Sequence, residues 1–170
     1  LFESGYFQRV NELRFKRLLR KMENHVILCG YGRVGQEISN QIKTQDIPII
    51  VVESDEDRKK IAEENGLEVL CADATLDETL KLAGLEKCKS LVVTLPNDAA
   101  NLYVVLSAKG IRSSIRVIAR AGTEEAASKL RLAGASIVVS PYIAAGRAMA
   151  SMALRPIAID FLDLLAGSEC

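Results

Sequence analysis

The residues with the clearest chemical meaning form the stretch HVILCGYGRVGQEI, residues 25 to 38, in which an apolar run passes into three glycines and then into a helical pattern. The glycines have the spacing GxGxxG, which binds a pyrophosphate when it lies between a strand and a helix. Gly30 permits a sharp turn, Gly32 lets phosphates approach the backbone, and Gly35 lets the helix pack closely on the strand. The free N–H groups at the helix start then face the phosphates. The predicted loop site comprises Gly30, Tyr31, Gly32, Arg33, Val34 and Gly35. Its alternative is a tight turn with a structural role only.

A carboxylate at Glu53 supports a nucleotide site. It ends the second apolar run, near the spacing of about 20 residues expected for an acid that accepts hydrogen bonds from the adenosine ribose. A carboxylate there favours a free 2′-hydroxyl and repels a 2′-phosphate, so we expect NADP to be disfavoured. The alternative for Glu53 is a solvent-facing acid before an acidic helix start.

Further candidates lie in loops that follow the expected strands, where open α/β sheets bind their ligands. The stretch ADAT follows the third apolar run, and TLPND includes the end of the fourth. We predict that Asp73 lies beside the adenine, and a role as a hydrogen-bonding residue of its own loop is equally open. The candidates in these loops are Ser54, Asp73, Ala74, Thr94 and Asn97.

Two periodicities alternate along the chain and predict the elements that position these residues. Short apolar runs predict strands at 25–30, 48–52, 68–71, 90–94, 115–119 and 136–139. Helical patterns lie between them at 34–43, 55–65, 76–83, 99–109 and 124–133. Regular alternation without polar residues inside the strands favours a parallel sheet covered on both faces. We therefore predict an α/β protein with a Rossmann-like, doubly wound, six-stranded parallel sheet.

The predicted helices carry local start and stop signals. Ser54 precedes an acidic helix start, and Thr75 with Glu78 forms a capping-box pattern, so both are predicted N-caps. A glycine follows four of the helical patterns, where a left-handed closing residue is favoured. These glycines are Gly66, Gly84, Gly110 and Gly134.

Composition narrows the class of protein. Lys+Arg and Asp+Glu both number 22, so the net charge gives no indication of a nucleic-acid partner. No apolar run reaches the roughly 18 residues that a membrane span requires. The cysteines show no CxxC spacing, and Cys29 and Cys71 lie in apolar runs, so we expect both to be small core residues in a reducing cytoplasm.

The two ends of the chain stand outside the strand–helix repeat. Residues 1–23 mix apolar and basic side chains, which predicts an amphipathic helix, either packed on its own domain or leading to a partner. Pro141 opens an alanine-rich helical stretch that runs to residue 154 without an obvious polar face. A helix that is apolar all round requires burial on more than one side, which the last helix of a sheet cannot obtain from its own chain alone.

Six features occur in order along the chain: NHVILCGYGRVG, the acid at Glu53, CADAT, TLPND, VIARA and KLRLAGASIVVSPYIAAGR. Together they resemble the KTN/RCK domain family, the regulators of potassium conductance, over roughly residues 24 to 155. The resemblance implies a domain at the cytoplasmic face of the cell membrane that dimerises through residues 141–154. It also implies assembly into an octameric ring on a potassium channel or transporter, regulated by NAD(H) or an adenine nucleotide (ATP, ADP or AMP).

The same resemblance divides the chain into three parts. Residues 1–23 resemble the linker from a channel pore, 24–140 the nucleotide-binding lobe, and 141–170 the dimerisation helix with the start of a hinge to a C-terminal lobe. We therefore expect a pore domain in the same full-length chain. The first residue is leucine and not methionine, which fits a piece of a longer protein.

Arg120 marks a departure from the calcium-gated members of this family. In those members, acids after the third and fifth strands form a cation site. Asp73 keeps the first acid, but Arg120 stands at the end of the fifth strand, and a guanidinium repels a cation that oxygen ligands bind. We expect no metal site of this type and place Arg120 in the nucleotide-binding set.

Three functions remain open at this point: the sensing domain of a potassium channel, a peripheral subunit of a potassium uptake transporter, and the cofactor domain of an NAD-dependent oxidoreductase. Hydride transfer requires a proton donor or acceptor near the nicotinamide. The only histidine, His25, begins the first strand, at the end away from the predicted site, where a packing role is expected. Tyr103 and Tyr142 lack the lysine of a YxxxK pair. The sequence therefore favours a non-enzymatic sensor.

Overall fold

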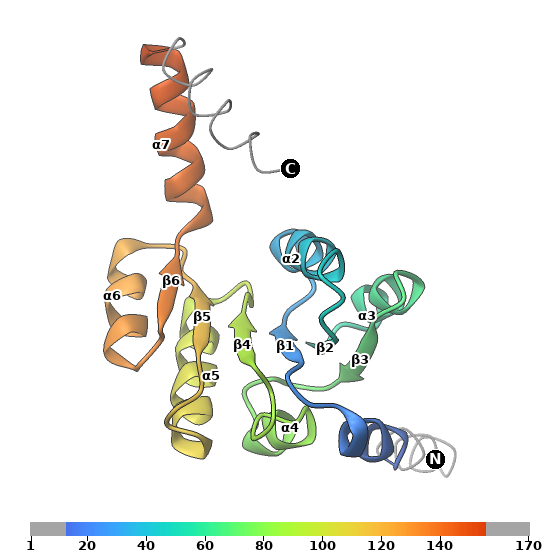
Figure 1. The fold of residues 1–170 in the computed structure, drawn as a ribbon. Coiled ribbons are helices and arrows are strands. Elements are labelled where there is room, and N and C mark those ends of the chain that lie inside the picture. The colour runs from blue at the N-terminus through green and yellow to red at the C-terminus, as the bar shows by residue number, and fades with distance from the viewer. Residues whose placement is uncertain (1–12, 156–170) are drawn as a thin grey trace.

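The structure is a computed structural model that describes residues 13–155 of the 170-residue chain. Its centre is one sheet of six parallel strands in the order β3-β2-β1-β4-β5-β6 (Figure 1). The strands are β1 (Val26–Cys29), β2 (Ile49–Glu53), β3 (Glu68–Cys71), β4 (Ser90–Val93), β5 (Val117–Arg120) and β6 (Ile137–Val139). Each lies within two residues of a predicted range, so the predicted fold class is confirmed.

Helices follow the strands and cover both faces of the sheet. They are α2 (Arg33–Lys43), α3 (Glu56–Glu64), α4 (Asp77–Leu82), α5 (Asp98–Ile111), α6 (Glu124–Leu132) and α7 (Pro141–Leu154). α2 and α3 pack on one face, and α4, α5 and α6 pack on the other. α7 continues beyond β6 and projects away from the sheet (Figure 1). Among residues 13–155, no helix has the length and apolar character needed to cross a bilayer.

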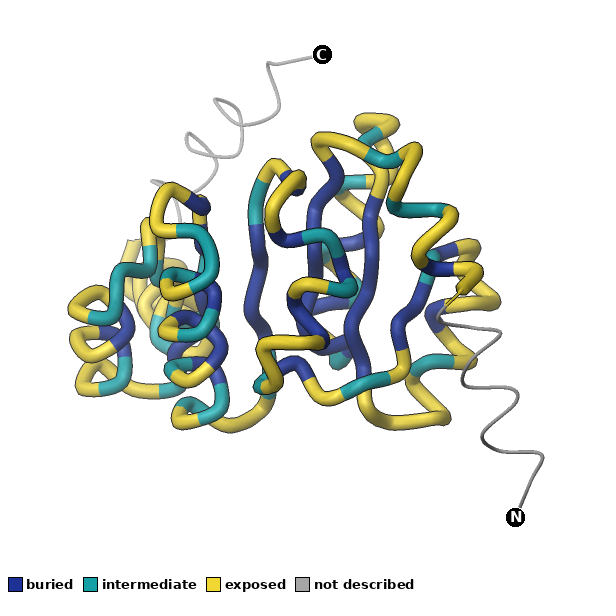
Figure 2. The backbone as a smooth tube through the Cα atoms, turned by 90° about the horizontal axis from the view of Figure 1, so that it is seen from below, coloured by how far each residue is buried: buried dark blue, intermediate teal, exposed yellow. Residues whose placement is uncertain are grey.

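Successive strand residues supply two separate cores. Ile27 and Cys29 belong to the cluster beneath α4, α5 and α6, while Val26 and Leu28 belong to the cluster beneath α2 and α3. Figure 2 shows the central strands as buried segments between helices whose outer sides are exposed. Since both faces of β1 are covered, its sequence is apolar throughout and not alternating.

The sheet is left uncovered near β6. Ile137 pairs with Ile118, whose side chain packs with the α2–α3 cluster, yet Ile137 and Val139 are 41% and 44% exposed. α7 has no buried residue. Within the described residues, the β6–α7 surface therefore has no covering element. We define this surface by Ile137, Val139, Tyr142, Met149, Met152 and Leu154, all of which are exposed.

A helical segment at residues 13–21 packs against the α4 side of the sheet. Phe15 is buried, and Leu19 and Met22 are half-buried against the same cluster. Arg14 Nη2 lies 3.2 Å from Glu68 Oε2 at the edge strand β3. This part of the predicted amphipathic helix thus packs on its own domain, whereas residues 1–12 of the expected linker and 156–170 of the expected hinge lie outside the described residues.

Two predicted N-caps are wrong because other groups occupy those positions. Asp55, not Ser54, caps α3 and accepts from the Arg58 backbone N–H at 2.9 Å. Thr75 donates its hydroxyl to Asp73 at 2.7 Å, and α4 begins after Leu76 without a side-chain cap. At α3 the Asp55 carboxylate takes a backbone donor of the first turn, and at α4 the Thr75 hydroxyl is engaged by the Asp73 carboxylate and not by a helix N–H.

The predictions that Gly110 closes a helix and that Cys71 is a core residue are also wrong. Gly110 lies inside α5, which continues to Ile111 because Ile111 packs on the core, whereas Gly66, Gly84 and Gly134 have the predicted positive φ. Cys71 is exposed, unlike buried Cys29, because it is the last residue of the edge strand β3.

His25 is buried at the amino end of β1, as expected from the sequence. Its Nε2 lies 2.9 Å from the Ala83 carbonyl oxygen, so Nε2 carries the proton and donates. Its Nδ1 is buried and has no hydrogen-bond partner. Burial lowers the pKa of His25 below its ordinary value of 6.5, and the bond to Ala83 raises it by less.

This arrangement predicts a loss of stability on acidification. Below pH 6.5 the unfolded chain protonates His25, but the folded chain does so only at its lowered pKa, so the folded state binds fewer protons in that window. The free energy of unfolding should therefore fall as pH drops below 6.5, by up to roughly 1.4 kcal/mol per pH unit from this residue. Urea denaturation between pH 7.5 and 5.0 checks this, with His25→Gln as the control that lacks the titration. Equal pH slopes for the two proteins would contradict it.

Candidate functional site

The predicted site residues gather at the carboxyl edge of the sheet. β1 and β4 are neighbours there, and their chains leave in opposite directions, β1 toward α2 on one face and β4 toward α5 on the other (Figure 1). Open α/β sheets bind ligands at such a point, where the direction of winding reverses. The glycine loop and the loop after β4 flank this position.

The three glycines differ in what the protein itself requires of them. Gly30 has φ +95°, a conformation that favours glycine. A Cβ on Gly35 would clash with the Gly30 carbonyl oxygen, so Gly35 permits the close packing of α2 on β1. A Cβ on Gly32 would meet no atom within 4 Å, and its φ of −76° is open to any residue. The fold therefore explains Gly30 and Gly35 but leaves open space at Gly32, as a phosphate site requires.

The start of α2 suits an anion. Gly32 is its N-cap and supplies no capping side chain, and the first turn contains no acidic residue. The first N–H groups of the helix are thus free of side-chain acceptors within the described residues, and the helix dipole favours negative charge there. Arg33 is exposed and Val34 half-buried at this turn.

Glu53 lies against the glycine loop and is not a solvent-facing acid. Its side chain is buried; Oε2 accepts from the Tyr31 N–H at 2.7 Å and Oε1 from the Asp55 N–H at 2.9 Å. A carboxylate has about four acceptor sites, so these two bonds leave capacity for a ribose hydroxyl. The same bonds fix the end of β2 to the loop after β1.

Several predicted residues are held by burial or by hydrogen bonds within their own loops. The Tyr31 side chain is fully buried beneath α2, with Oη accepting from Asn65 Nδ2 at 3.2 Å, so only its backbone belongs to the loop. Ala74 is buried in the core, while Ser54 is exposed. Asp73 Oδ1 accepts from the Thr75 N–H at 2.9 Å and from its hydroxyl, which is the loop-bonding role that the sequence left open.

The loop after β4 supports the glycine turn. Thr94 is buried, and its Oγ1 lies 3.1 Å from the carbonyl oxygens of both Cys29 and Gly30, to which it can donate. Asn97 caps α5 by accepting from the Ala99 N–H at 2.8 Å. Both residues lie at the predicted edge, Thr94 as an internal support and Asn97 as an exposed cap.

Sequence reasoning missed Asn101, which holds this edge together. It is fully buried; its Oδ1 accepts from the Leu95 N–H at 2.9 Å, and its Nδ2 donates to the carbonyl oxygens of Leu95 and Arg120 at 3.0 and 3.1 Å. Asp98 similarly accepts from the Gly122 N–H at 2.8 Å. A polar residue one turn after the Asn97 cap, in an apolar helix, was the available signal.

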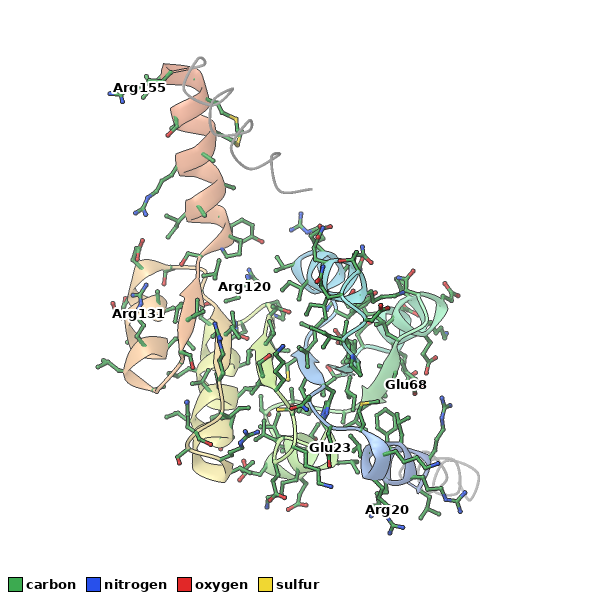
Figure 3. All side chains as sticks on the ribbon, viewed as in Figure 1. Arg20, Glu23, Glu68, Arg120, Arg131 and Arg155 are labelled. Atoms are coloured by element: carbon green, nitrogen blue, oxygen red, sulfur yellow. The ribbon has the colours of Figure 1, made fainter. Side chains whose placement is uncertain are left out.

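Arg120 brings a cation to the same edge. Its Nη1 donates to the Leu95 carbonyl oxygen at 3.2 Å, while its Nε is buried without a partner. Its Cζ lies 5.3 Å from the centroid of the Tyr142 ring. Figure 3 shows the labelled Arg120 side chain between the end of β5 and the base of α7. Among the described residues this guanidinium makes one hydrogen bond, so it keeps N–H donors that an anionic ligand at this edge can use.

Neither a metal cluster nor a wide depression on the surface coincides with the glycine loop. Among residues 13–155, no three His, Cys, Asp or Glu side chains gather as potential metal ligands. A wide depression of about 1530 Å³ lies beside β3 and the 13–21 segment, lined by Arg14, Glu68 and Lys81 among others. None of its lining residues belongs to the glycine loop, so it is not the nucleotide site predicted there.

The chain is similar to a known protein family and to curated sequence relatives. The model of the TrkA-N domain matches residues 26–141. Potassium channel protein 1 of Methanocaldococcus jannaschii is 36% identical over 171 residues, covering 99% of this chain and 51% of the relative. The chain spans about half the length of such curated relatives.

Solved structures agree with the sequence relatives. The TrkA-N domain of the inner membrane protein YbaL from Escherichia coli superposes with a TM-score of 0.73 at 32% identity, covering 78% of this chain and 98% of that one. GsuK bound to ADP superposes with a TM-score of 0.68 at 27% identity, covering 84% of this chain and 38% of that one.

Proposed function

The chain belongs to the TrkA-N domain family, and from this premise we propose that it is the ligand-sensing regulatory domain of a potassium channel. It binds an adenine nucleotide or NAD(H) and couples that binding to potassium transport. The observation that carries the proposal is the open space at Gly32, bordered by the uncapped start of α2 and by Glu53. A relative named as a potassium channel and the ADP complex of GsuK support it.

Each part of the site has a role in this proposal. The backbone of Gly32 and the first N–H groups of α2 hold a pyrophosphate. Glu53 accepts from the adenosine ribose, and the Asp73–Ala74 loop borders the adenine. Arg33 and Arg120 supply positive charge to the phosphates, since a planar guanidinium can pair with two phosphate oxygens at once.

The proposed assembly follows from the uncovered elements. Residues 24–140 form the nucleotide-binding lobe, residues 1–23 link it to a pore domain in the same full-length chain, and residues 141–170 form the dimerisation helix and the start of a hinge. The β6–α7 surface supports a homodimer through residues 141–154, because nothing in the described chain covers it. Such dimers build an octameric ring at the cytoplasmic face of the membrane.

The channel function is favoured over a transporter function by the extent of similarity. The match to the M. jannaschii channel covers 99% of this chain, including the segment before β1, whereas the match to the antiporter YbaL covers 68%. An oxidoreductase is disfavoured because the single histidine, His25, lies at the amino end of β1, opposite the proposed site. We propose that the domain has no catalytic activity.

The proposed function is tested by calorimetric titration of ADP, ATP, NADH and NADP into the protein and its Glu53→Gln variant. Glutamine keeps an acceptor for the loop but loses the charge, so ribose binding should weaken about tenfold and the rejection of NADP should relax. Glu86→Gln, an exposed acid between α4 and β4, serves as the control and should bind like the wild type. Equal affinities for Glu53→Gln and wild type would exclude this site.

A wild type that binds none of these ligands would exclude the proposed function itself. The coupling to transport is measured as potassium flux through the full-length channel in vesicles. The flux should change on addition of the ligand identified by calorimetry, and a flux that ignores this ligand would contradict the sensing role.

A further inference from the structure

We propose that the Tyr142 ring and a nucleotide phosphate compete for the guanidinium of Arg120, so that Arg120 couples the nucleotide site to α7. This inference rests on the proposed nucleotide-binding function and names how that site is regulated. The position of Arg120 supports it. The backbone of Arg120 is fixed in the sheet, and its guanidinium lies between the loop after β4 and the first turn of α7.

The anchoring of Arg120 leaves its head incompletely satisfied. Its backbone carbonyl oxygen accepts from Asn101 Nδ2 at 3.1 Å, at the end of β5. Its Nη1 donates to the Leu95 carbonyl oxygen at 3.2 Å, but its buried Nε has no acceptor. A guanidinium has five N–H donors in a fixed plane, and a buried unpaired donor is costly. The head of Arg120 is therefore prepared to accept a better partner.

The contact with Tyr142 is one of few that join α7 to the sheet. The Arg120 Cζ lies 5.3 Å from the ring centroid, within the range of a cation–π interaction. α7 has no buried residue, and Tyr142 stands in its first turn. An ion pair between Arg147 and Glu124, at 3.4 Å, also joins α7 to α6, but both side chains are exposed and such pairs contribute little.

The two partners of Arg120 are unequal in strength. An exposed cation–π contact is weak, whereas a charge-assisted, bidentate bond from arginine to phosphate is strong. Arg120 should therefore turn from the ring to a phosphate held at the carboxyl edge. By reciprocity, whatever removes the ring must raise the affinity for a phosphate-bearing ligand.

If the contact between Arg120 and Tyr142 is purely structural, the opposite result is expected. If Tyr142 only holds Arg120 in a productive position, its removal should weaken ligand binding or leave it unchanged. The sign of the effect of one substitution therefore distinguishes competition from support.

The experiment compares ADP and adenosine binding by calorimetry in wild type, Tyr142→Leu and Tyr142→Phe. Tyr142→Leu should bind ADP about two- to fivefold more tightly, the range that an exposed cation–π contact supplies, and adenosine unchanged. Tyr142→Phe keeps the ring and should behave like the wild type. In an Arg120→Gln background, Tyr142→Leu should have no effect on ADP affinity.

Hydrogen exchange supplies a readout that does not depend on affinity. ADP should accelerate exchange of the amides of residues 144–147 in the wild type and not in Arg120→Gln, because Ala144 N–H makes the first hydrogen bond of α7. Tyr142 belongs to the β6–α7 surface, so its substitution can change the oligomeric state. Sedimentation therefore identifies conditions in which all variants have the same oligomeric state, and exchange is measured there.

The outcomes separate this inference from the proposed function. ADP binding that is equal or weaker in Tyr142→Leu, with wild-type binding intact, overturns the competition and leaves the nucleotide site standing. A wild type that does not bind ADP, ATP or NADH overturns the proposed function and this inference together.

Discussion

Met149→Asp is expected to convert a dimeric wild-type protein into a monomer. Tyr142, Ala145, Met149 and Met152 follow one another at three- and four-residue steps, which places them on one stripe of α7. Tyr142 and Met149 are 58% and 69% exposed in the single chain. If this stripe is the dimer interface, an aspartate in it leaves an uncompensated buried charge, at a cost of about 3–5 kcal/mol. The dimer dissociation constant should rise by at least two orders of magnitude.

Sedimentation equilibrium across a concentration series measures this effect. Ala145→Asp should act like Met149→Asp because it lies on the same stripe. Ser113→Asp introduces the same charge in the exposed turn after α5 and should leave the dimer intact. A monomeric wild type, or a Met149→Asp variant that associates as strongly as the wild type, would remove the basis for a ring built through α7.

Alanine substitutions at two glycines of one motif should have opposite consequences. Gly32→Ala should change the free energy of unfolding by no more than about 1 kcal/mol, because its Cβ meets no protein atom and its φ is permitted. It should nevertheless weaken ADP binding at least about tenfold, since the methyl group occupies the space that a phosphate needs to reach the backbone. Gly32→Ala should therefore weaken ADP binding without a comparable loss of stability.

Gly35→Ala should instead destabilise the fold. Its Cβ would clash with the Gly30 carbonyl oxygen, and relief requires α2 to move from β1, at a cost of about 1–3 kcal/mol. Chemical denaturation and ADP calorimetry on both variants measure the contrast. Unchanged ADP affinity in Gly32→Ala would argue against a phosphate at this loop, and a Gly35→Ala protein as stable as the wild type would argue against the packing role.

The central strands could be predicted because they are buried on both faces. An apolar run such as VILC at β1 has the same meaning wherever the strand lies in the sheet. The exposure of Cys71 required the strand order, because only the edge position of β3 leaves its last side chain uncovered. The start of α3 required knowledge that Asp55, and not Ser54, reaches the Arg58 N–H, and the start of α4 required knowledge that Asp73 engages the Thr75 hydroxyl.

The predicted site likewise contains residues whose roles follow from the local sequence and residues whose roles require the fold. The roles of Gly30 and Gly35 depend on local geometry and follow from the motif itself. Asn101 could not be assigned, because its three bonds join a loop after β4 to the end of β5, which meet only in the folded chain. The contact between Arg120 and Tyr142 spans two elements that no local pattern connects.

Because α7 is long, a small rotation at its base moves its far end by several ångströms. At 1.5 Å per residue, its 14 residues make an arm about 21 Å long, pivoting near Ser140 and ending at Leu154. A tilt of about 10° at the pivot carries the far end about 4 Å, close to the separation of two atoms in van der Waals contact. If the exchange of partners proposed for Arg120 tilts the base of α7 slightly, the arm enlarges that tilt to a displacement that can replace one set of contacts by another.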